Sequence, residues 1–179
     1  MRTTTTTALM LALSCATVAC ARVEAEVPEA EVTQKAVSFQ AVPGGSALGE
    51  VSITQSFTIS ADDLSWAKDL NSEVYATAVE IKLLGDVKDL SFIHYARVLM
   101  SDGAADSSTA PVEVISYQRP DGMAPTDDLL VKTNYPIDVT KVWASKKITI
   151  TLQLAGVLPE QAWSADITLH MGGKMSYKF

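Results

Sequence analysis

Apolar and polar residues alternate along most of the chain, which is the pattern of β-strands with one buried face. The alternation is most regular at residues 147–154 (KITITLQL), where isoleucine or leucine occupies every second position. It also holds from Trp163 to Phe179, where the odd positions are apolar or glycine and the even positions are mostly polar. We interpret Gly172-Gly173 as a bend or bulge inside this one long strand.

The segment from Val74 to Met100 (VYATAVEIKLLGDVKDLSFIHYARVLM) is expected to form the centre of the domain. Two runs rich in β-branched residues flank Gly85-Asp86, which predicts a β-hairpin or two neighbouring strands. The second run is apolar on both faces, as is typical of a strand in the middle of a sheet. The face of the first run that we expect to be buried comprises Tyr75, Thr77, Val79, Ile81 and Leu83, and Glu80 and Lys82 lie on the opposite face.

The remaining elements complete an all-β pattern. Further strands are expected at residues 31–42, 50–60, 111–117 and 128–134. Short helical segments are expected at residues 60–71 and 138–144, the second with Val142 and Trp143 packing inward. Within residues 50–60, only Gln55 interrupts the apolar set. This spacing predicts one antiparallel β-sandwich of about eight strands, with an immunoglobulin-like architecture and one or two short helical turns. The residues expected in its core are Val79, Ile81, Phe92, Val98, Ile150, Leu152, Ile167 and Leu169.

Residues 1–19 have the composition of an export signal. Arg2 precedes a short apolar run, Ala8–Ala19, which is shorter than the ~20 residues that a membrane-spanning helix needs. Thr17-Val18-Ala19-Cys20 resembles the lipobox of bacterial lipoprotein signal peptides, with Thr17 at the position where leucine is usual. Ala19-Cys20-Ala21 also fits an ordinary signal-peptidase site, so cleavage without lipidation stays open.

The lipoprotein resemblance implies an acyl lipid such as palmitate on Cys20 and attachment to a membrane of a bacterial cell envelope. The protein would then lie in the periplasm or at the cell surface, for example on the outer membrane, and would otherwise be secreted. Residues 20–31 are acidic and contain Pro28, which predicts a flexible tether. The sandwich domain is expected to occupy residues 32–179.

Composition narrows the classes of partner and chemistry. The net charge is −7, and it becomes −8 when residues 1–19 are removed, because Arg2 is their only charged residue. An acidic chain without a cluster of basic residues is unsuited to nucleic acid. Cys15 and Cys20 are the only cysteines, so we expect neither a disulfide nor thiol chemistry in the folded part.

Candidate catalytic residues are sparse. Of the two histidines, we expect His94 to be a hydrogen-bonded core residue and His170 to lie on the polar face of the last strand. Asp102 and Asp106 could contribute to a calcium site, but turn formation explains them better. Asp127-Asp128 stands at the start of an element, where capping explains it. No catalytic, metal or cofactor site is predicted.

The pattern therefore favours an exported envelope β-sandwich with a binding or structural role, which is not an enzyme. Two alternatives stay open. The first is a small eight-stranded outer-membrane β-barrel, because apolar residues alternate up to a terminal Phe179. The second is a secreted enzyme whose site the sequence does not mark.

Overall fold

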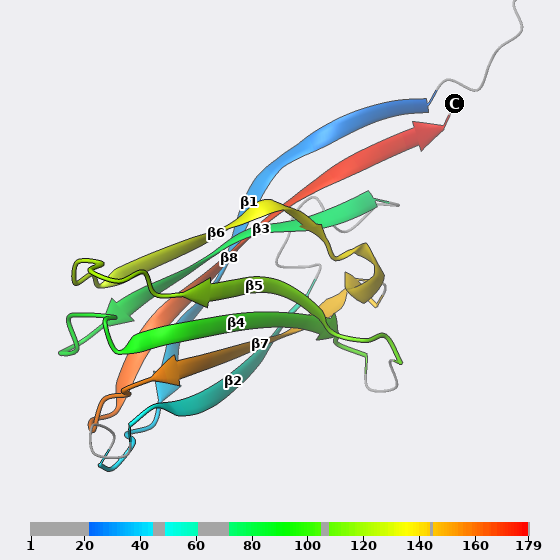
Figure 1. Ribbon diagram of the computed structural model, residues 1–179. Helices are drawn as coiled ribbons and strands as arrows, with labels where there is room; N and C mark the ends of the chain where they lie inside the picture. Colours follow the sequence, from blue (N-terminus) through cyan, green and yellow to red (C-terminus); the bar gives the residue numbers. More distant parts are fainter. Residues whose placement is uncertain (1–21, 45–48, 61–71, 105–107, 144, 179) are drawn as a thin grey trace, which may run out of the picture.

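The computed structural model describes residues 22–44, 49–60, 72–104, 108–143 and 145–178, and these form two β-sheets packed face to face (Figure 1). The expected helix at residues 60–71 lies almost wholly outside the described residues. The strands are β1 (Arg22–Phe39), β2 (Val51–Ser60), β3 (Ser72–Leu84), β4 (Ile93–Asp102), β5 (Val112–Gln118), β6 (Asp128–Asp138), β7 (Lys147–Gly156) and β8 (Trp163–Lys178). A 3₁₀ helix, η2 (Thr140–Trp143), buries Val142 and Trp143 as predicted.

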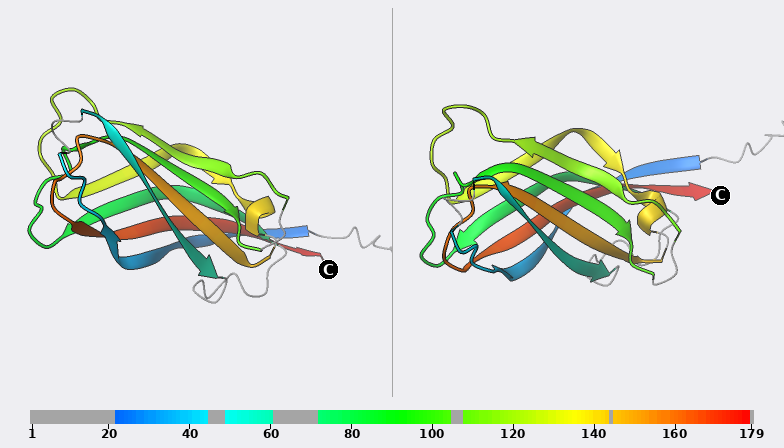
Figure 2. Two further views of the ribbon diagram at one scale, coloured as in Figure 1. Left: turned by 90° about the horizontal axis from the view of Figure 1, so that it is seen from below. Right: turned by 60° about the horizontal axis from the view of Figure 1, so that its bottom comes forward.

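Each sheet has four antiparallel strands, in the orders β1-β8-β3-β6 and β2-β7-β4-β5. The pairs β4·β5, β3·β6, β2·β7 and β1·β8 all form, so the chain is folded in half and then rolled into two layers. The two layers are visible in both views of Figure 2. Eight strands with this connectivity form a jelly roll.

The predicted all-β sandwich is confirmed, and its strand order adds detail that the sequence did not supply. The immunoglobulin comparison holds for the two packed antiparallel sheets, but immunoglobulin domains connect their strands in a different order. The barrel alternative is wrong, because the described strands form two separate sheets, each with two outer strands, and do not close on themselves.

The expected hairpin within Val74–Met100 is also wrong. β3 pairs with β8 and β6, whereas β4 lies in the other sheet and pairs with β7 and β5. The link between them is too long for a tight hairpin, and it buries Leu90 completely as it crosses from one sheet to the other. Alternation identifies a strand but not its partner, which is why the sequence suggested the nearest one.

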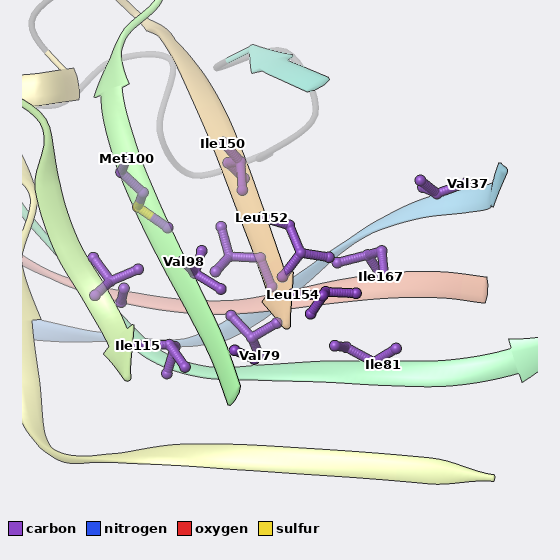
Figure 3. Close-up of a cluster of buried hydrophobic side chains, with 14 of the residues drawn as sticks. Val37, Val79, Ile81, Val98, Met100, Ile115, Ile150, Leu152, Leu154 and Ile167 are labelled. Atoms are coloured by element: carbon purple, nitrogen blue, oxygen red, sulfur yellow. The ribbon is translucent and has the colours of Figure 1, made fainter. Parts of the chain in front are cut away.

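The core fills the space between the two sheets, as the close-up in Figure 3 shows. Seven of the eight predicted core residues are buried, and the eighth, Phe92, is half-buried against the core. The alternation in β8 is confirmed from Trp163 to Met171, where every odd position is buried. Gly172 and Gly173 lie inside β8, as expected, but the irregularities occur in the partner strands β1 and β3.

One of these irregularities corrects the predicted face of β3. The pairing of β3 with β8 slips between Ala76 and Ala78, so Thr77 is an extra residue relative to β8 and forms a bulge. The pairing of β3 with β6 is also irregular at this point, where residues 133–136 of β6 lie between the partners of Ala78 and Ala76. Before the bulge the buried core residues are Val74 and Ala76, and after it they are Val79, Ile81 and Leu83; Ala78 is buried as well but does not belong to the core cluster. Tyr75 and Thr77, which were expected to be buried, are therefore turned away from the core and only half-buried.

Residues 22–31, which were expected to belong to a flexible tether, instead form the first part of β1. They pair with the end of β8, from Arg22 opposite Lys178 to Glu31 opposite His170. The acidic composition of this segment would not by itself offset the conformational entropy lost when the segment becomes ordered. Backbone hydrogen bonds to the neighbouring strand β8 provide that compensation. The paired strands β1 and β8 extend beyond most of the other strands and form an arm (Figure 1). At the tip of this arm, Arg22 lies next to the C-terminal end of β8.

Candidate binding site

The candidate site is centred on His170, on the outer face of the sheet that contains β1 and β8. His170 follows Leu169 and precedes Met171, and both neighbours are buried in the core, so the imidazole points to the opposite face. β8 lies between β1 and β3, whose side chains flank the ring. Only 14% of the His170 side chain is exposed as a result.

The bulges in β1 and β3 bring two further side chains to this ring. The pairing of β1 with β8 slips between Val27 and Ala30, which places Glu29 in the irregular stretch. The Thr77 hydroxyl, at the bulge of β3, donates to the Glu29 carboxylate and also lies 3.2 Å from the carbonyl oxygen of His170. Thr77 therefore fixes Glu29 across the intervening strand.

Carboxylates face both nitrogens of the imidazole. His170 Nδ1 lies 3.8 Å from Oε1 of Glu31 and 4.0 Å from Oε1 of Glu29. His170 Nε2 lies 3.8 Å from Oε2 of Glu80, is buried, and has no hydrogen-bond partner. These separations exceed the length of a hydrogen bond, so the carboxylates are neighbours of the ring and not its hydrogen-bond partners.

A fourth carboxylate reinforces the negative charge on one side of the ring. Burial raises the pKa of Glu80, and the Asp128 carboxylate beside it raises that pKa further by repulsion and by a hydrogen bond. His170 and Lys82 act in the opposite direction, but the net pKa of Glu80 remains above 4.5. Glu80 and Asp128 therefore form a carboxylate pair that favours any added positive charge.

The surface beside His170 is hollowed. One hollow of about 420 Å³ is lined by Glu29, Glu31, Thr77, Ala78, Leu130, Lys132, Thr133, Pro136 and His170. A second, of about 480 Å³, shares Glu29, Thr77 and Pro136 with the first and reaches Tyr75 and Lys174. The two hollows adjoin because they share these residues. Leu130 is 47% exposed and gives this groove an apolar wall next to its carboxylates.

This arrangement suits a cationic group with an apolar stem. Ionised carboxylates accept charge-assisted hydrogen bonds from an ammonium or guanidinium group, and an aliphatic stem can pack on Leu130 and Pro136. Within the described ranges, no three histidine, cysteine, aspartate or glutamate side chains are arranged to hold a metal ion.

The other residues considered from the sequence lie elsewhere. His94 is not a core residue: its side chain is 37% exposed and its Nδ1 lies 2.7 Å from Oε1 of Glu50. His94 is an extra residue in the pairing of β4 with β7, between Ile93 and Tyr95, and this irregularity at the start of β4 explains the difference. Asp102 accepts a hydrogen bond from the Ala104 amide at 3.1 Å, which is turn chemistry, and Asp106 and Cys20 lie outside the described residues.

Sequence reasoning placed His170 on the polar face but missed the carboxylates around it. Glu29 and Glu31 had been expected to belong to a tether, and Asp128 to cap an element. The pattern did place Glu80 on the outward face of its strand, but nothing local indicated that β8 would lie between β1 and β3.

No protein-family model matches the chain, and no curated protein matches its sequence. The solved structures that resemble it include the decameric BFDV capsid protein, at 12% identity and a TM-score of 0.40, covering 87% of this chain and 99% of that one. The 60-mer of the BFDV capsid protein is similar at 11% identity and a TM-score of 0.40, covering 87% and 94%. The infectious bursal disease virus Gx strain structure is similar at 16% identity and a TM-score of 0.32, covering 88% and 36%. These similarities assign neither a family nor an activity to the chain.

The described part of the chain contains no helix that is long and apolar enough to cross a membrane.

Proposed function

We propose that this protein is exported, carries a lipid on Cys20, and presents its sandwich to a cationic partner in a bacterial cell envelope. The anchor is supported by the lipobox-like Thr17–Cys20 segment. It is also supported by the position of Arg22, which lies two residues after Cys20 and at the tip of the β1·β8 arm. A lipid attached there would leave the rest of the sandwich clear of the bilayer surface.

The binding role is carried by one observation, the three glutamates that face the two ring nitrogens of His170. Like charges held close together around one side chain repel one another, and a bound cation relieves that repulsion. The chemistry fits a lysine or arginine side chain of another protein, or a free amine of similar shape. The net charge, which is −8 once residues 1–19 are removed, would also attract such a partner over longer distances.

We propose binding rather than catalysis because the site lacks an activated nucleophile. The Thr77 hydroxyl donates to Glu29 and lies beside a backbone carbonyl oxygen, and it is not paired with the imidazole. His170 Nε2 is buried, so it is not positioned to exchange a proton with a substrate in the groove.

The anchor is tested by Cys20→Ser. Lipid contributes ~0.8 kcal/mol of membrane affinity per buried CH₂, so the loss of two or three acyl chains should release the protein from the membrane fraction. The measurement is cell fractionation combined with metabolic labelling by a palmitate analogue. An unlabelled wild type, or a Cys20→Ser protein that stays in the membrane fraction, would refute the anchor.

The binding role is tested separately, by titrating the purified protein with tetralysine and with tetraglutamate in a calorimeter. Tetralysine should bind with an affinity that falls as salt is added, and tetraglutamate should not bind. Glu31→Gln should weaken tetralysine binding several-fold. Glu50→Gln is the matched control, because it makes the same change beside the other histidine. Equal effects of the two substitutions would show that tetralysine responds to overall charge and not to this site.

A further inference from the structure

The outer edge of β2 differs from the three other sheet edges. An outer strand exposes unpaired backbone groups, and proteins usually protect such edges with charges, proline, bulges or shortness. β1 contains two register irregularities, and it also contains Pro28 and several charged residues. β5 is only seven residues long, includes Glu113 and contains one irregularity. β6 contains Pro136 and Lys132. These three edges are therefore poor templates for another strand.

β2 has none of these protections. Its ten residues, Val51–Ser60 (VSITQSFTIS), include no charged residue, no proline and no glycine. All ten pair with β7 without a register irregularity, so the strand is regular along its whole length. Within the residues that the structure describes, no strand pairs with its other edge. β2 thus offers a regular, uncharged edge on a protein of net charge −7.

The outer face of β2 is a ladder of small hydroxyl side chains. Ser56 lies 3.1 Å from Thr151 and Thr58 lies 3.3 Å from Thr149, measured between the hydroxyl oxygens, so this ladder already continues into β7. Cross-strand pairs of serine and threonine stabilise antiparallel sheets. A second strand with the same pattern could extend the ladder in the other direction.

The inward face of β2 is apolar but incompletely covered. Val51, Ile53 and Phe57 are only half-buried, and none of the described strands flanks them on the outer side. Gln55, the one polar residue in this set, is half-buried at the middle of the strand. A polar residue at such a position lowers stability unless it has a partner, and a single buried amide often fixes the register of a pairing.

We propose that two copies of the protein pair antiparallel through β2, about a two-fold axis at Gln55. In this register Gln55 faces Gln55 of the second copy, so their amides can hydrogen-bond to each other. Ile53 then faces Phe57, and Thr54 faces Ser56, so that apolar and hydroxyl residues match on their respective faces. The pairing joins two four-stranded sheets into one continuous sheet and brings no charged residues of β2 together.

The test uses the full-length protein with either charge at the axis. Gln55→Lys and Gln55→Glu each place like charges directly opposite each other in the dimer, whereas in the monomer either side chain can extend from the open edge into water. Sedimentation velocity should show a dimer for the wild type and about tenfold or greater weakening for each variant alone. An equimolar mixture of the two variants should recover the dimer. Gln161→Lys, at an exposed position, is the matched control and should behave as the wild type.

Disulfide trapping gives a second readout that does not depend on the folding of the charged variants. Gln55→Cys should form an intermolecular cross-link under mild oxidation, because directly opposite Cβ atoms lie ~4.5–5.5 Å apart in an antiparallel pair. Gln161→Cys should not exceed the cross-linking of the wild type. A monomeric wild type, a mixture that fails to recover the dimer, or equal cross-linking at positions 55 and 161 would overturn the proposal. Dimerisation that the Gln55 variants leave unchanged would show that copies meet elsewhere.

Discussion

Gly156 is the position where one added methyl group should disturb the fold most clearly. It ends β7 and pairs with Val51 in β2 and with Ile93 in β4. A Cβ atom at Gly156 would lie 1.9 Å from the carbonyl oxygen of Phe92 and 2.9 Å from the amide nitrogen of His94. A carbon and a carbonyl oxygen approach no closer than about 3.3 Å, so the start of β4 would have to move by about 1.4 Å.

That displacement sets the size of the expected effect. A hydrogen bond of normal length that opens by about 1.4 Å is lost, and each backbone group left buried without a partner costs ~1–3 kcal/mol. Gly156→Ala should therefore lower the free energy of unfolding by about 2–4 kcal/mol. For a domain of this size, that corresponds to a fall of about 4–16 °C in the melting temperature.

Gly172→Ala is the matched control, because Gly172 also lies inside a strand but a Cβ atom there meets nothing within 4 Å. It should change the free energy of unfolding by no more than about 1 kcal/mol in either direction. Urea denaturation followed by circular dichroism measures both variants. A Gly156→Ala protein as stable as the wild type, or equal losses in the two variants, would refute the close approach of β4 to β7.

Three further predictions concern the core and the ionisable groups. Ile150→Ala should cost ~2–5 kcal/mol in urea denaturation because Ile150 is 2% exposed, whereas Thr149→Ala on the opposite face should cost ~1 kcal/mol or less. Burial and Asp128 raise the pKa of Glu80, so the contribution of Glu80 to stability is present below pH 4.5 and is lost as the pH rises through the folded-state pKa. The Glu80→Gln protein should therefore be more stable than the wild type at pH 7 and equally stable in acid. Burial alone would raise the pKa of Asp89, but hydrogen bonds from neighbouring groups lower this pKa below 3.8. The Asp89→Asn protein should therefore be less stable than the wild type at pH 7, and this difference should shrink as the pH falls through that pKa. Thermal melts from pH 2 to 8 test both, and a pH-independent difference from the wild type would contradict either one.

The sequence predicted the strands well because alternation is a local signal. Most strand bounds fall within a few residues of the expected ones, and β7 and β8 show the expected buried faces. The end of β6 was missed because proline usually stops a strand, yet β6 runs through Pro136 as an outer strand, where proline is tolerated.

Partner choice and bulges were not predictable from the same signal. Both depend on contacts between residues that are far apart in the sequence, such as Thr77 with Glu29 and with the carbonyl group of His170. A single extra residue in β3 reversed the expected faces of Tyr75 and Thr77. The candidate site depends on these same long-range pairings, so only His170 and the outward position of Glu80 could be anticipated.

The folded-in-half connectivity also determines when the fold can form during synthesis. β1 is the first strand to leave the ribosome, but within the described residues its only sheet neighbour is β8, which is made last. β3 likewise needs β8 on one side, so one of the two sheets cannot assemble until nearly the whole chain has emerged. The innermost pair, β4·β5, can form early, and the pairs around it close in turn toward the termini. Until β8 is made, β1 and β3 therefore have no common partner between them, and this sheet stays unassembled in the nascent chain.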